Sequence, residues 1–288
     1  MKKGLKLSRE EISWILYDVG NSAFVLVMVT AIMPIFFKDF AAKGVADAVS
    51  TAHWGFANSS ASLLLAILAP LLGTFADYKN FKIKFFIFFL VIGLGFTLLL
   101  TMVNEGQWML CLFLFVFARV GWAGANVFYD AFIVDVTPKK HMDRISANGY
   151  AWGYIGSVVP FLIIIAMIMT TPEKAGVSLP VLQTKIGFLL VAVWWLVFSI
   201  PMIKNVKQRY FIPSSFSPIS ASFKRLWQTF KKIRKYRQAF LFRISSFFYI
   251  DGAVTIISMS TAAGRALGLG VNILFALFLL IRIISFSF

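Results

Sequence analysis

Uncharged apolar stretches, each long enough to cross a lipid bilayer, recur along this chain. Residues 53–75, 85–103, 149–169 and 186–203 form runs of 23, 19, 21 and 18 residues without a charged side chain. An α-helix rises about 1.5 Å per residue, so roughly 20 such residues span the ~30 Å hydrocarbon core. These four runs predict an all-α membrane protein whose chain crosses the bilayer several times.

The composition supports a membrane protein over a soluble one. Hydrophobic residues make up 59% of the chain and charged residues only 14%, well below the ~25% that is usual in soluble domains. Cys111 is the single cysteine, which excludes a disulfide within the chain and a thiolate metal cluster. We interpret His53 and His141, which are far apart in the sequence, as interfacial residues, and we expect neither a metal ion nor a cofactor.

Four further stretches have the length of a span but carry charges. They are residues 14–37 with Asp18, 108–133 with Arg119 and Asp130, 239–260 with Arg243 and Asp251, and 267–288 with Arg282. Together with the uncharged runs they predict about eight transmembrane helices. Ser8 is followed three residues later by Glu11, a spacing typical of a capping box that starts the first helix.

Positive charge is unevenly distributed over the loops. If the N-terminus is cytoplasmic, the inner segments (1–13, 76–84, 135–148 and 204–238) hold 20 Lys and Arg residues, against 5 in the outer loops. This bias predicts a cytoplasmic N-terminus by the positive-inside rule. The net charge of +16 therefore indicates membrane orientation, and we expect no nucleic-acid partner.

The longest connection, residues 204–238, divides the chain into a six-helix bundle (1–203) and the first two helices of a second bundle (239–288). Within it, Leu226, Trp227, Phe230 and Ile233 recur at helical spacing among basic residues. This pattern predicts an amphipathic helix that binds anionic lipid at the membrane surface. A second six-helix bundle would need about 130 further residues at ~20 per span, so we expect the chain to be a fragment or a prematurely terminated protein.

The turn between the second and third spans carries a recognisable motif. It reads Gly73-Thr-Phe-Ala-Asp77-Tyr-Lys79-Asn-Phe-Lys82-Ile-Lys84. The segment resembles the major facilitator superfamily signature of Gly-x-x-x-Asp followed by a basic cluster, with Asn80-Phe81 where Gly and a basic residue are usual. The resemblance implies that Gly73 and Asp77, with Lys79, Lys82 and Lys84, form a cytoplasmic gate; the alternative is an ordinary basic loop.

Segments on other spans narrow this resemblance. They are residues 17–24 (YDVGNSAF), 55–59 (GFANS), 126–132 (NVFYDAF), 146–156 (SANGYAWGYIG) and 249–252 (YIDG). In this order they are similar to the vacuole-effluxer branch of the superfamily, which includes the autophagy-related vacuolar amino-acid effluxers and their bacterial relatives. Members have twelve spans, so the resemblance implies a major-facilitator-type bundle that is incomplete here.

Charged residues inside the spans are the main candidates for function. A carboxylate in a span is costly unless it is paired, protonated or hydrated, and Asp18 and Asp251 lie on the first and seventh spans, each between a Tyr and a Gly. Such carboxyl groups can bind and release protons, or can pair structurally with Asn21 and Arg243. The candidate substrate- or proton-binding residues are Asp18, Asn21, Asn58, Arg119, Tyr129, Tyr249 and Asp251.

The sequence predicts a secondary active transporter that works by alternating access between two bundles. The resemblance implies proton-coupled efflux of amino acids or similar small solutes, from a plasma membrane if the source is bacterial or a vacuolar membrane if it is fungal. No Walker-type phosphate loop is present to support ATP-driven pumping. Two alternatives stay open: a non-transporting remnant, and a membrane-embedded enzyme acting on lipid-linked substrates through Asp130, Asp135, His141 and Asp143.

Overall fold

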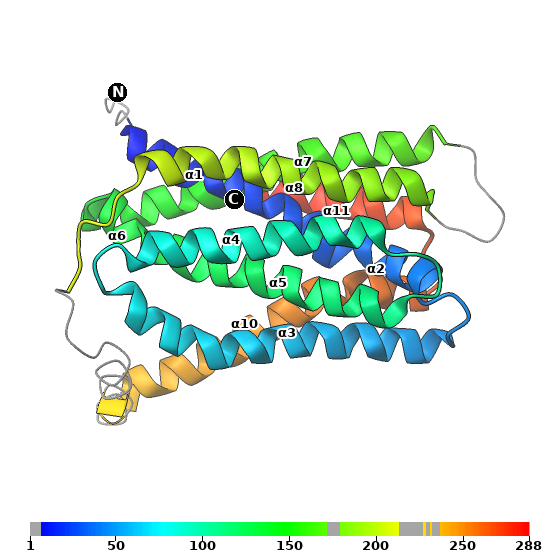
Figure 1. Ribbon diagram of the computed structural model, residues 1–288, viewed down its shortest axis with the longest axis horizontal. Helices are drawn as coiled ribbons and strands as arrows, with labels where there is room; N and C mark the ends of the chain where they lie inside the picture. The colour runs from blue at the N-terminus through cyan, green and yellow to red at the C-terminus, as the bar shows by residue number, and fades with distance from the viewer. Residues whose placement is uncertain (1–6, 172–178, 213–226, 229–230, 232–236, 288) are drawn as a thin grey trace.

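Long helices lie side by side along one direction in the computed structural model (Figure 1), which describes residues 7–171, 179–212, 227–228, 231 and 237–287. The first bundle contains α1 (Arg9–Phe24), η1 (Val25–Ala31), α2 (Ile32–Phe36), η2 (Phe37–Ala41), α3 (Asp47–Ala76), α4 (Phe81–Leu99), η3 (Leu100–Met102), α5 (Trp108–Ala131), α6 (Ile133–Val136), η4 (Lys139–His141), α7 (Met142–Met169) and α8 (Val181–Asn205). It is followed by α10 (Arg237–Ala266) and α11 (Val271–Ser287).

All eight predicted spans correspond to helices. Six helical segments of the described chain are long and apolar enough to cross a membrane: Arg9–Ala41, Phe81–Met102, Trp108–Val136, Lys139–Met169, Val181–Asn205 and Phe240–Ala266. The other two predicted spans lie in α3, which is 30 residues long, and in the shorter apolar helix α11. The prediction of an all-α, multi-pass membrane protein is confirmed.

The first helix begins where its capping box predicts. The hydroxyl of Ser8 accepts a hydrogen bond from the backbone N–H of Glu11 at 3.1 Å, and the Glu11 carboxylate accepts one from the Ser8 N–H at 2.7 Å. Two backbone N–H groups at the helix start are thereby satisfied. The helix then continues through the π-helical segments η1 and η2, a local widening that occurs frequently at functional sites.

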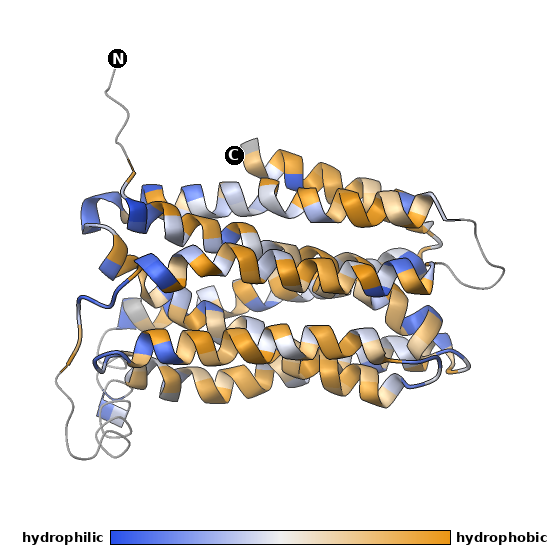
Figure 2. Cartoon of the chain, turned by 45° about the horizontal axis from the view of Figure 1, so that its top comes forward, coloured by the Kyte–Doolittle hydropathy of each residue, from blue (hydrophilic) through white to orange (hydrophobic). Residues whose placement is uncertain are grey.

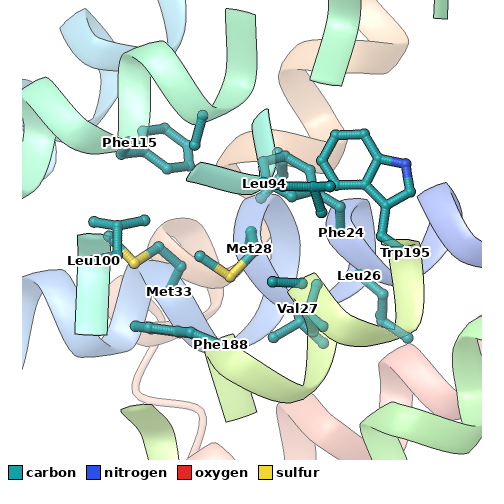
Figure 3. Packing of buried hydrophobic residues seen from close by; sticks show 14 of the residues in the cluster. Phe24, Leu26, Val27, Met28, Met33, Leu94, Leu100, Phe115, Phe188 and Trp195 are labelled. Atoms are coloured by element: carbon teal, nitrogen blue, oxygen red, sulfur yellow. The ribbon is translucent and has the colours of Figure 1, made fainter. Parts of the chain in front are cut away.

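This first helix lies at the centre of the hydrophobic core (Figure 3). Phe24, Val27, Met28 and Met33 are buried there among residues of other helices, including Leu94, Phe115, Phe188 and Trp195. In contrast, many large apolar side chains of the outer helices are exposed, and apolar residues extend along the outward-facing sides while hydrophilic residues gather at the bundle ends (Figure 2). A lipid environment explains this pattern, because hydrocarbon solvates apolar side chains.

The segments predicted to be cytoplasmic meet at one end of the bundle. The carboxylate of Glu11 accepts a hydrogen bond from Thr137 at 2.7 Å, and Glu10 forms an ion pair with Arg209. The amphipathic helix predicted within residues 204–238 lies mostly outside the described residues. The domain boundaries stay a prediction, although α8 ends at Asn205 and α10 begins at Arg237.

Candidate functional site

A cavity of about 860 Å³ lies between the first bundle and the two helices that follow it. Its wall is formed by α1, η1, α5 and α7 on one side and by α10 and α11 on the other. The volume falls within the range of small-molecule sites, ~300–1,000 Å³. Three of the predicted site residues, Asp18, Asn21 and Tyr129, line it.

The carboxylate of Asp18 is held in place by neighbouring polar groups. The side-chain amide of Asn21 donates a hydrogen bond to Asp18 Oδ1 at 2.8 Å, and Trp122 Nε1 donates to Asn21 Oδ1 at 3.0 Å. The chain Trp122–Asn21–Asp18 links α5 to α1. It orients the carboxylate at the cavity wall, where Asp18 is only 8% exposed.

Aromatic rings form the cavity wall next to Asp18. The rings of Trp14 and Tyr129 are stacked with centroids 4.3 Å apart, and Trp14 Nε1 donates a hydrogen bond to the backbone carbonyl of Tyr129 at 3.0 Å. The Tyr17 ring also packs against Tyr129, with ring centroids 4.7 Å apart. The buried hydroxyl of Tyr129 has no hydrogen-bond partner among the described residues, so it is available to a polar ligand.

A glycine stripe on α7 lets this helix approach Asp18 closely. A Cβ added at Gly153 would lie 2.7 Å from Ser22 Oγ and 3.2 Å from Asp18 Cγ, and one added at Gly149 would lie 2.8 Å from Trp14 Cζ3. Larger residues would therefore displace the site residues of α1. The stripe is therefore a packing surface that lets α7 lie directly against Asp18 and its neighbours on α1.

Two charged residues of the cavity were left out of the predicted site. Asp130, on α5, and Arg282, on α11, both line the cavity, and the charge of Asp18 interacts with those of both residues. The Arg282 guanidinium lies over the ring of Tyr154, with its Cζ 5.1 Å from the ring centroid. Their signal in the sequence was a charge inside a span, the same signal that selected Asp18 and Asp251.

Four other predicted residues do not line this cavity. Asn58 is buried on α3 and donates a hydrogen bond to the Trp54 carbonyl at 2.9 Å. Arg119 is buried on α5, where Nη1 has no partner among the described residues. Tyr249 and Asp251 are exposed on α10. The roles of these four residues stay predictions.

The predicted gate motif contains a buried ion pair at the same end of the bundle as the N-terminus. Gly73 and Asp77, at the end of α3, are exposed, whereas Lys82 at the start of α4 is buried. Lys82 Nζ lies 2.6 Å from Asp135 Oδ2 and donates a hydrogen bond to the Ala131 carbonyl at 2.9 Å. The ion pair of this motif therefore joins α4 to α6. Asp135, the partner of Lys82, was not among the predicted gate residues.

The remaining motif residues lie at the surface. Lys79 is exposed, with Nζ 5.3 Å from the centroid of the Phe211 ring, and Lys84 is also exposed. The backbone carbonyl of Asp77 accepts a hydrogen bond from the N–H of Ile212 at 2.8 Å. The start of the 204–238 connection is thus attached directly to the motif.

The chain departs from the usual signature at Asn80, and the backbone there shows why the change is tolerated. It stands where the signature has Gly, and its backbone is left-handed, with φ of 64°. Gly adopts this conformation without cost, and Asn is among the side chains that tolerate it best. The turn into α4 is therefore retained without a glycine.

The described residues contain no group of three or more His, Cys, Asp or Glu side chains that would hold a metal ion. Of the residues considered for a lipid-linked enzyme, Asp130 lines the cavity and Asp135 is paired with Lys82, so they belong to different sites. The cavity combines charged, hydrogen-bonding and aromatic side chains.

Comparisons with known proteins identify a family for this chain. The family described as "Vacuole effluxer Atg22 like" matches residues 49–287. The uncharacterized MFS-type transporter YxiO of Bacillus subtilis is 45% identical over 285 residues, which cover 98% of this chain and 66% of the relative. The chain thus spans just under two thirds of that protein's length.

Two fungal proteins match a shorter part. Autophagy-related protein 22 of Yarrowia lipolytica is 28% identical over 39% of this chain and 22% of its own length. Autophagy-related protein 22-1 of Sclerotinia sclerotiorum is 34% identical over 39% of this chain and 21% of its own length. No solved structure shows a significant match. The predicted resemblance is confirmed: this chain belongs to the Atg22-like vacuole-effluxer family of major-facilitator-type proteins.

Proposed function

We propose that this chain acts in secondary active transport and exports amino acids or similar small solutes by alternating access, coupled to protons. The observation that supports this most directly is the charged cavity between the first bundle and α10 and α11. A site between two bundles is exposed to one side of the membrane and then to the other when the bundles rock against each other. The 204–238 connection would join the moving parts and bind anionic lipid.

Asp18 is the residue we propose for coupling. Its carboxylate lines the cavity and is hydrogen-bonded by Asn21 at 2.8 Å. A proton and the ammonium group of a bound amino acid would compete for the same carboxylate. Protonation on one side of the membrane would then release the solute, and proton loss on the other side would restore binding. Asp251, exposed on α10, is proposed as a second titrating group.

Asp18→Asn should abolish uphill transport while exchange down a concentration gradient partly survives, because the amide keeps a hydrogen-bond acceptor but cannot carry the proton. The measurement uses the 288-residue chain in liposomes, with radiolabelled amino acids and an imposed pH gradient. The matched control is Asp143→Asn, because Asp143 is an exposed residue at the start of α7. Full uphill transport by the Asp18→Asn variant would contradict the coupling role. No transport by the unchanged chain would favour the non-transporting alternative.

We also propose that the N-terminus is cytoplasmic. A cysteine placed at Lys140, next to α7, should then resist a membrane-impermeant thiol reagent in intact cells, whereas one placed at Glu105, between η3 and α5, should react. Both positions are exposed, and the natural Cys111 is buried, so the background should be low. Permeabilised cells control for the reactivity of each cysteine. The opposite labelling pattern would reverse the proposed orientation.

A further inference from the structure

The cavity contains more negatively charged than positively charged side chains. Two carboxylates, Asp18 and Asp130, and one guanidinium, Arg282, line it. None of the three forms a salt bridge with another residue in the part of the chain that the structure describes. The cavity therefore has a formal charge of −1, and its charged groups are separated instead of being paired with one another. Asp18 is buried, Arg282 is half-buried and Asp130 is exposed. Charged groups inside a helical bundle that lack a partner within the protein can pair with a ligand.

The three charged groups are close enough to influence one another across the cavity. Arg282 lies over Tyr154 and interacts electrostatically with Asp18. Asp130 also interacts electrostatically with Asp18. All three charged groups line the same cavity, and the aromatic rings of Tyr129 and Tyr154 line it with them. An anionic ligand group fits beside Arg282, and cationic groups fit beside the two carboxylates.

The walls between these charges suit a cation with an apolar stem. Trp14, Trp122, Tyr129, Tyr150 and Tyr154 all line the cavity. Aromatic faces attract ammonium and guanidinium groups and also pack against methylene chains. Trp14 and Tyr129, which are stacked 4.3 Å apart, line the cavity together with both carboxylates.

We propose that the solute is a basic amino acid, an α-amino acid whose side chain carries a second cationic group. Its carboxylate would pair with Arg282, its α-ammonium with Asp18, and its side-chain cation with Asp130. This inference rests on the proposed function, because it assigns the substrate class of the same cavity. It goes further by giving each of the three charged groups a separate partner on the solute.

Other classes of solute leave at least one of the three charged residues without an oppositely charged partner. A neutral amino acid leaves Asp130 without a cation, and an acidic amino acid places a carboxylate beside it. A diamine without a carboxylate leaves Arg282 without an anion. A solute that covers one of these charges without pairing with it loses binding free energy, so each of these solutes should bind more weakly than a basic amino acid.

The test compares three probes that share a carbon chain: lysine, norleucine, which lacks the side-chain ammonium, and cadaverine, which lacks the carboxylate. Binding to the purified 288-residue chain in detergent is measured by calorimetry. We expect lysine to bind at least ~10-fold more tightly than either other probe, since each of the others leaves one charged group of the cavity without its partner. Norleucine binding as tightly as lysine would overturn this inference and leave the proposed amino-acid export intact.

Two variants test the individual assignments. Asp130→Asn should weaken lysine binding about 10-fold or more and leave norleucine binding nearly unchanged, which also shows that the cavity is folded. Arg282→Gln should weaken lysine and norleucine but not cadaverine. Equal loss of all three probes in either variant would overturn its assignment. If neither lysine nor norleucine bound the unchanged chain, and liposome transport of all amino acids were absent, the proposed function would fail as well.

Discussion

Lys82→Met is expected to lower the free energy of unfolding by about 3–5 kcal/mol, the usual cost of removing one partner from a buried ion pair. The side chains of Lys82 and Asp135 are 6% and 0% exposed, and their charged atoms lie 2.6 Å apart. The other carboxylate oxygen, Asp135 Oδ1, accepts the backbone N–H groups of Arg209 and Tyr210 at 2.8 and 2.9 Å. Without Lys82, the carboxylate stays buried with only these neutral donors.

The control for this prediction is Lys84→Met, two residues away on the same helix. Lys84 is exposed, so the change should be nearly neutral. Thermal unfolding in detergent should show a loss of roughly 10 °C for the Lys82 variant, at ~2–4 °C per kcal/mol. Restoring stability with Lys82→Met/Asp135→Leu would show that the penalty comes from the stranded charge. Equal melting temperatures for the Lys82 and Lys84 variants would contradict a buried pair.

Gly121→Ala is expected to lower the free energy of unfolding by about 1–3 kcal/mol or more, the cost of overpacking a close contact. A Cβ added at Gly121 would lie 2.5 Å from Gly93 Cα and 2.9 Å from the carbonyl oxygen of Phe89. These atoms belong to the backbone of α4, so no side-chain rotation relieves the clash. The helices α4 and α5 would have to move apart.

Gly95→Ala is the matched control. It lies on α4 two residues from Gly93, and an added Cβ there meets nothing within 4 Å. Alanine also favours a helix over glycine by ~1 kcal/mol, so this variant should be neutral or slightly stabilised. Melting temperatures measured side by side in one detergent decide the result. A Gly121 variant as stable as the Gly95 variant would show that α4 and α5 are not in backbone contact.

Asp18, Asn21 and Tyr129 were selected from the sequence and line the cavity, since a polar residue in a span is unusual enough to be noticed. The same signal also selected Arg119 and Asp251, which do not line it. Asp130 and Arg282, which do line it, carry the signal too but were not among the predicted site residues. A charge in a span is visible in the sequence, but the direction in which it points is not. That direction depends on which helices pack together.

The sequence by itself determined the class of protein, the positions of the eight helices and the start of the first one at Ser8. These features depend on local properties, namely the hydropathy of about 20 consecutive residues and a cap formed over four. Only the tertiary structure decided that Arg282 and Asp18, 264 positions apart in the sequence, line the same cavity and that Lys82 pairs with Asp135. Residues distant in the sequence become neighbours in this way because glycines and aromatic side chains determine how closely helices approach, and that fit involves several helices at once.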